Sequence, residues 1–177
     1  GTSILTSDAQ SMFPVFSSTS EDKVSDVEAP STSADAVNFD PNDLALEYSD
    51  SQFGFSFHYP AGMRSSRSSL GNGVVSVAIA GGEDGTEGFQ IMVTPLEEDL
   101  TLNVERIRAD LPDLAISGIK EFSIDGGTGV VFASDDPGFN GDSREVWFVS
   151  NNMLFQMSTY AKNERLLDAV LKTWRFN

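Results

Sequence analysis

The heptapeptide FGFSFHY at positions 53–59 constrains the fold more than any other stretch, because a large aromatic ring recurs at every second residue. The rings are those of Phe53, Phe55, Phe57 and Tyr59. Side chains of a β-strand alternate between the two faces of a sheet, so these four share one face and His58 lies on the other. The pattern predicts a strand with a buried aromatic face, and Pro60, which has no amide donor, ends it.

Six further stretches have strand composition, at 74–80, 88–95, 119–124, 128–134, 144–150 and 153–160. The last four form two hairpins, because Asp125-Gly126-Gly127 and Asn151-Asn152 accept the positive φ of tight turns. Two amphipathic helices are predicted as well. One runs from an Asp99 cap to Pro112, and the other follows Asn163 to the C-terminus. Their apolar stripes are Leu100, Val104, Ile107 and Leu111, and Leu167, Val170, Leu171 and Trp174. The chain is therefore expected to be α+β, with a meandering antiparallel sheet of about seven strands and two helices.

Residues 1–45 have a different character from the rest. Thirteen of the first 38 residues are Ser or Thr, and acids are scattered among them without an apolar period. Such a composition is typical of a solvated linker. We expect 1–45 to be a flexible acidic tail and 46–177 to be a single α+β domain. Tails of this kind commonly separate a domain from an anchor, so we expect an extracytoplasmic location, secreted or in the cell envelope, with attachment through the tail.

One apolar cluster interrupts this tail. Met12, Phe13, Val15 and Phe16 can bind in a groove of a partner protein or on the surface of the domain itself, and the alternative is a chance apolar patch without a function.

The overall charge excludes some partners. The chain has 27 acids against 11 Lys and Arg, a net charge of −16, and both its tail and its domain are acidic. Binding to nucleic acid rests on basic residues that displace counterions, so nucleic acid is not expected as a partner. The chain has no cysteine, which excludes disulfides and thiolate chemistry. It also has no run of about 18 apolar residues that would span a bilayer.

Several segments together resemble the PsbP-like family. They are Tyr48 followed by FGFSFHYPAGM, a helix after the third strand, the IDGGTG run at 124–129, and a terminal LKTWRF. Met63 stands where such sequences commonly have a tryptophan. The resemblance covers 46–177. It implies an α/β/α sandwich and, in bacteria, secreted or lipid-anchored envelope proteins. The photosystem members are assembly or stabilising subunits, and no shared catalytic centre carries over.

Two places carry residues of the kind used in chemistry. His58 can act as a base, but a catalytic triad needs a nucleophile and an acid that converge on it, and Ser56 lies on the same strand without a turn. No catalytic residue is therefore assigned. The loop 135–145 offers oxygen ligands for calcium from Asp135, Asp136, Asn140, Asp142 and Glu145. Its spacing is not that of an EF-hand, and the alternative is a solvated hairpin loop.

The sequence thus favours a non-enzymatic extracytoplasmic module that presents a sheet edge or a helix face to an envelope protein. The first alternative is a carrier or sensor for a lipid or small ligand, with calcium at the acidic loops. The second is a hydrolase that uses His58.

Overall fold

The computed structural model describes residue 40 and residues 42–177. The strands are β1 Leu46–Asp50, β2 Phe55–Tyr59, β3 Arg64–Gly71, β4 Val74–Gly81, β5 Glu87–Pro95, β6 Ile116–Ile124, β7 Gly127–Ser134, β8 Ser143–Ser150, β9 Met153–Tyr160 and β10 Arg175–Phe176. The helices are α1 Val104–Asp110 and α2 Glu164–Lys172, and two 3-10 turns lie at Pro137–Phe139 and Ala161–Asn163.

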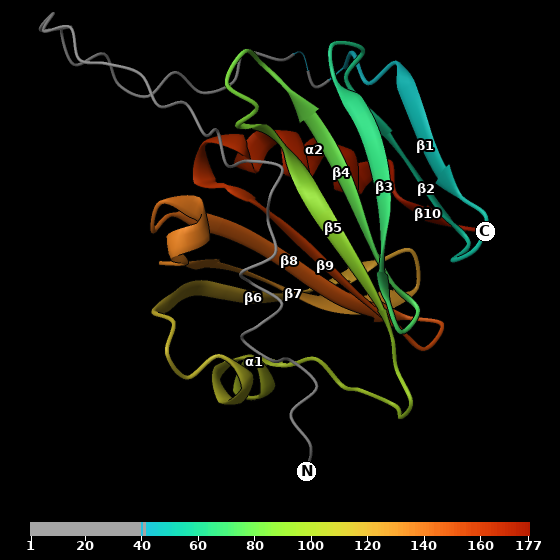
Figure 1. Cartoon of the computed structure of the whole chain (residues 1–177). Helices are drawn as coiled ribbons and strands as arrows, with labels where there is room; N and C mark the ends of the chain where they lie inside the picture. The colour runs from blue at the N-terminus through green and yellow to red at the C-terminus, as the bar shows by residue number, and fades with distance from the viewer. Residues whose placement is uncertain (1–39, 41) are drawn as a thin grey trace, which may run out of the picture.

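The strands form two antiparallel sheets (Figure 1). The larger has the order β3-β4-β5-β9-β8-β7-β6, and the smaller has the order β1-β2-β10. The predicted α+β fold with a seven-stranded meandering sheet is confirmed. Its membership differs from the prediction, because the aromatic strand at 53–59 is β2 of the smaller sheet. The seventh place in the larger sheet belongs to β3, which sequence analysis did not identify.

The aromatic face of β2 builds the first core, between the larger sheet on one side and α2 with the smaller sheet on the other. Phe55 and Phe57 are fully buried, and the indole of Trp174 stacks on both rings at centroid distances of 4.8 and 5.4 Å. Phe53 and Tyr59 are buried as well, with 8% and 7% of their surface exposed. The prediction that the odd-numbered rings point into the interior is confirmed.

A second core covers the opposite face of the larger sheet. Ile107 of α1 is fully buried against a cluster that includes Phe132, Trp147 and Leu154. Figure 1 shows α1 and α2 on opposite sides of the sheet. The resulting layers are helix, sheet and helix, as the α/β/α sandwich requires.

The ends of both helices differ from the prediction. Asn103, not Asp99, caps α1, and its side chain accepts a hydrogen bond from the amide of Arg106 at 2.8 Å. Leu102, in the segment that precedes the helix, is buried. The second helix, α2, ends at Lys172 and does not continue to the C-terminus. The residues after it form β10, which pairs with Ser56 and Phe55 of β2.

Asn163 occupies the predicted cap position of α2, but its side chain bonds elsewhere. Its Nδ2 donates to the carbonyl oxygens of Thr86 and Gly88 at 2.8 and 3.1 Å, and to Oγ1 of Thr159 at 3.0 Å. Asn163 therefore joins the start of β5, the end of β9 and the start of α2.

Within the described residues, neither helix is long and apolar enough to cross a membrane. The predicted tail lies almost entirely outside the described part of the chain, and so do Met12, Phe13, Val15 and Phe16.

Candidate functional site

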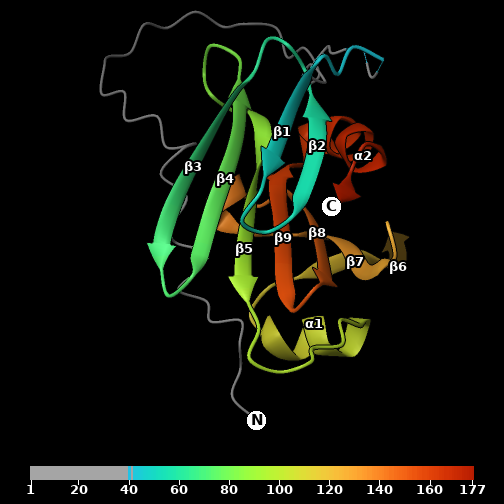
Figure 2. The same ribbon diagram turned by 90° about the vertical axis from the view of Figure 1, so that its right-hand side faces the viewer.

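The most exposed strand of the structure is β3. All eight of its residues, Arg64 to Gly71, are exposed to solvent. It pairs with β4 on one side, and no described strand pairs with the other side. Figure 2 shows β3 as the outermost strand of the larger sheet. Its outer row of backbone donors and acceptors is thus open to a further strand.

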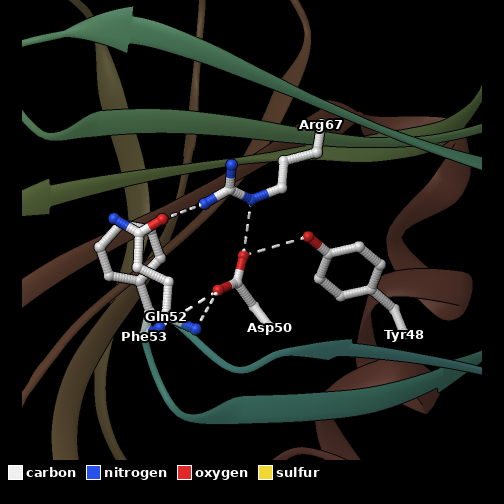
Figure 3. Close-up of polar contacts among 5 residues, drawn as sticks. All are labelled: Tyr48, Asp50, Gln52, Phe53 and Arg67. Atoms are coloured by element: carbon white, nitrogen blue, oxygen red, sulfur yellow. Dashed lines mark hydrogen bonds and ion pairs between the residues drawn. The ribbon is translucent and has the colours of Figure 1, made fainter.

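A buried carboxylate fixes β3 to the smaller sheet (Figure 3). Asp50, at the end of β1, is only 4% exposed. Its Oδ1 accepts hydrogen bonds from the amides of Gln52 and Phe53 at 3.0 and 3.1 Å. Its Oδ2 accepts from Nε of Arg67 at 2.9 Å and from the hydroxyl of Tyr48 at 3.3 Å. We call these five residues the Asp50 cluster.

The electrostatics of the cluster favour the charged carboxylate. Burial alone would raise the pKa of Asp50, but the hydrogen bonds from Arg67, Phe53 and Gln52 outweigh it and hold that pKa below its usual value. Burial, followed by the neighbouring charge of Asp50, raises the pKa of Tyr48 to about 12. Tyr48 therefore remains a neutral donor at any physiological pH.

The cluster also determines which side chains of β3 face the molecule. Arg67 contacts Asp50, and Ser65 receives a 3.5 Å hydrogen bond from the hydroxyl of Tyr59. Alternate residues therefore face away from the smaller sheet. They are Arg64, Ser66 and Ser68, and the regular alternation ends at the register shift between Ser69 and Gly71.

The structure does not place His58 in a candidate catalytic triad. Its side chain is exposed on β2, opposite Glu47 of β1 in the strand register, and its backbone amide donates to Oγ1 of Thr173. It lines neither of the two clefts described below. Nothing in the described residues gives His58 a nucleophile.

The five residues proposed for calcium have separate environments. Asp136 caps the turn at Pro137–Phe139 by accepting from the amide of Gly138 at 2.8 Å, and Asp135 accepts from the amide of Ala115 at 2.8 Å. Asn140 adopts a left-handed conformation, with φ 56°, after that turn, and Asp142 is exposed.

Glu145 is separated from the loop surface, because it lies on the buried face of β8. It is 4% exposed, and its Oε2 accepts from Nε1 of Trp147 at 3.1 Å and from Oγ of Ser158 at 2.5 Å. No described cation pairs with it. Burial raises the pKa of Glu145 to about 7, despite these hydrogen bonds. The alternation of Ser143, Glu145 and Trp147 in the sequence is the signal that could have placed it on the sheet.

Within residues 40 and 42–177, no group of three or more His, Cys, Asp or Glu side chains is arranged to hold a metal ion. Calcium at the acidic loop stays a hypothesis, and it now depends on ligands such as Asp142 rather than on Glu145.

Two clefts border β6. The larger, about 460 Å³, lies between the β6–β7 turn and the end of α2, and its walls include Phe122, Leu171 and Lys172. The smaller, about 220 Å³, lies beside Glu121 and Leu102. Both are on the rim of the sandwich. The space between the larger sheet and α2 is filled by packed rings instead.

One solved structure is informative about the fold of this chain. No protein-family model matches the chain, and no curated protein matches it. The structure is similar to cyanobacterial PsbP (CyanoP) from Synechocystis sp. PCC 6803, with a TM-score of 0.51 and 16% identity, over 84% of this chain and all of that one. It is also similar to a protein from Bacteroides thetaiotaomicron, with a TM-score of 0.45 and 13% identity, over 76% of this chain and 49% of that one.

The match to cyanobacterial PsbP agrees with the resemblance drawn from Tyr48, FGFSFHYPAGM and the terminal LKTWRF. The chain therefore has a PsbP-like fold.

Proposed function

We propose that this protein is a non-enzymatic accessory module of the cell envelope that binds another protein. One observation carries the proposal: β3 is fully exposed and has an outer edge that no described strand pairs with. An edge of this kind binds extended chains through main-chain hydrogen bonds. The filled interior supports the same function, because it leaves the surface as the place for binding.

An extracytoplasmic location belongs to this proposal. The Ser/Thr-rich acidic composition of residues 1–45 supports it, since such a segment suits a spacer between a domain and an anchor. The likeness to cyanobacterial PsbP supports an accessory module rather than a catalyst, because the PsbP-like resemblance implies no shared catalytic centre.

The test is capture of a partner from the envelope fraction of the source organism, followed by reconstitution of the complex from purified components. We expect a complex of defined stoichiometry by size-exclusion chromatography with light scattering. Excess unlabelled protein should compete for the partner. Hydrolysis of ester or peptide substrates that disappears in His58→Ala would contradict the proposal.

The cleft between α2 and the β6–β7 turn favours a second candidate, a carrier of an amphipathic carboxylate. Phe122 and Leu171 give this cleft an apolar wall. Lys172 and Arg175 are the cations that can pair with a carboxylate there, and they share the lining with Asp125 and Asp168. A fatty acid such as laurate is the probe. Binding to the native state must raise the melting temperature, and Lys172→Glu should reduce the rise. An unchanged melting temperature at millimolar laurate would remove this candidate.

A further inference from the structure

The two sheets have four edge strands, and three of them are protected. β10 has two residues and β1 has five. β6 is interrupted by a register shift between Ser117 and Lys120, around Gly118, whose φ is +61°. Short strands and bulges are the devices by which proteins prevent unwanted pairing at an edge. β3 has eight residues, and its single irregularity lies at its end, between Ser69 and Gly71. It is the longest regular edge in the described structure.

The Asp50 cluster keeps this edge in place. Arg67 ties the middle of β3 to the buried Asp50 at 2.9 Å, and its guanidinium lies 5.9 Å from the ring centroid of Phe53. A strand that is already held in its extended conformation loses less conformational entropy when a partner binds. β3 is therefore pre-organised as a template for an added strand.

The side chains that face outward from β3 suggest what it recognises. Arg64 and Leu70 lie near opposite ends of β3, and Leu70 falls within the register shift between Ser69 and Gly71. No described residue forms an ion pair with Arg64. Leu70 is 38% exposed, and Leu46 is the only other large hydrophobic side chain exposed in the described part of the chain. One end of β3 can therefore pair with a carboxylate, and the other end can contact an apolar side chain.

We propose that β3 binds an extended segment of a partner protein as an eighth strand of the larger sheet. The segment carries one carboxylate beside Arg64 and one apolar side chain near Leu70, at the other end of the strand. A single carboxylate in a neutral segment fits best, since the net charge of −16 repels a strongly acidic one. This inference rests on the proposed protein-binding function and names its surface and its ligand.

The experiment is a titration of the full ¹⁵N-labelled chain with capped eight-residue peptides of Thr and Ser. One peptide has Glu at its first position and Leu at its seventh, and a second has the reverse order, because the added strand can run either way. A control peptide has Lys in place of Glu, which puts a like charge beside Arg64. We expect one of the two peptides to change the amide chemical shifts of residues 64–71. The control should bind roughly tenfold more weakly than that peptide.

Two further measurements identify the mode of binding. Arg64→Glu should weaken binding by at least about tenfold, whereas Arg165→Glu, the same change of charge at an exposed position of α2, should not. N-methylation of the peptide at alternate residues should abolish binding for one set of positions only, because only every second amide of an added strand points toward β3.

Three results would overturn the inference. They are shift changes outside β3 and β4, equal effects of the two N-methylated sets, and a dimer joined through β3 that excludes the peptide. If Arg64→Glu still captures the envelope partner at wild-type strength, the assignment to β3 fails and the protein-binding function stands. If the wild-type chain captures no partner, the proposed function itself fails, whatever the peptides do.

Discussion

Nε of Arg67 lies 2.9 Å from the buried Oδ2 of Asp50, and this contact joins the most exposed strand of the larger sheet to the end of β1 in the smaller one. An exposed strand of Arg, Ser and Gly contributes little apolar burial of its own. Its position therefore depends on its pairing with β4 and on this ion pair.

The first prediction concerns the two partners of this contact. Asp50→Ala should lower the free energy of unfolding by roughly 2–4 kcal/mol, because it removes the acceptor for the amides of Gln52 and Phe53 and leaves the hydroxyl of Tyr48 without its partner. Arg67→Ala should cost less, since Asp50 keeps its other three hydrogen bonds. Urea unfolding measures both, with Arg64→Ala as the control. Equal losses for Arg67→Ala and Asp50→Ala would contradict the central role of the carboxylate.

The second prediction is a fall in stability as the pH rises from 5 to 8. The pKa of Glu145 is about 7 in the folded protein, against a usual value of 4.5, so the folded state binds a proton that the unfolded state has already lost. The contribution of Glu145 to stability is then complete below pH 4.5 and decreases by up to about 3 kcal/mol as the pH rises through 7. Urea unfolding at several pH values should show this slope in the wild type and not in Glu145→Gln. Glu121→Gln, an exposed control on β6, should retain it.

At acid pH the free energy of unfolding should instead decrease as the pH falls. The pKa of Asp50 is lowered in the folded protein, so its contribution is present above the usual value near 3.8 and is lost as the pH falls below it. Asp50→Asn should remove this part of the acid sensitivity and leave the slope from Glu145 unchanged.

A third prediction tests the packing of the aromatic strand. Phe57→Ala should cost about 3–5 kcal/mol, because a fully buried ring between Trp174 and Phe89 is lost and a cavity remains. His58→Ala, one residue away on the exposed face, should change the free energy of unfolding by less than about 0.5 kcal/mol. Thermal unfolding followed by near-UV circular dichroism gives both values. Similar costs at the two positions would mean that the faces of β2 are assigned wrongly.

Gly88 gives a fourth prediction. Its φ is +130°, and a Cβ atom there would lie 1.9 Å from the carbonyl oxygen of Ile79 on β4. Gly88→Ala should therefore destabilise the protein by more than about 3 kcal/mol. Gly62→Ala is the matched control, because a Cβ there meets nothing within 4 Å. The expression level and the melting temperature are measured for both variants. A wild-type melting temperature for Gly88→Ala would refute the close approach of β4 and β5.

The fifth prediction concerns calcium. Glu145 is buried in β8, and Asp135 and Asp136 accept hydrogen bonds from backbone amides, so the loop has few oxygen ligands to offer. Calcium prefers six to eight. Millimolar calcium should leave the melting temperature unchanged relative to the same concentration of magnesium. A rise with calcium alone, lost in Asp142→Asn, would establish a site at the loop.

The parts of the fold that sequence predicted well have strong periodicity. The rings from Phe53 to Tyr59 alternate so regularly that only a one-sided strand explains them, and the turn at Asn151-Asn152 has the residues that a tight hairpin requires. The apolar spacing around Ile107 located the first helix, although Asn103 rather than Asp99 caps it.

The parts that sequence missed depend on tertiary context. β3 has no apolar alternation, so its extended conformation comes from its partner β4 and not from its own residues. Glu145 belongs by composition to an acidic loop, but its register opposite Ser158 places it inside the sheet. Sequence distance also conceals the Asp50 cluster, since Asp50 and Arg67 are 17 residues apart.

Residue-resolved amide hydrogen exchange of the free protein tests the central claim, that β3 is an open edge held in a strand conformation. The account predicts alternation along residues 64–69, with slow exchange at amides that bond to β4 and fast exchange at those that point outward. Slow exchange at both sets would mean that the edge is already covered, and fast exchange at both would mean that β3 is not a stable strand.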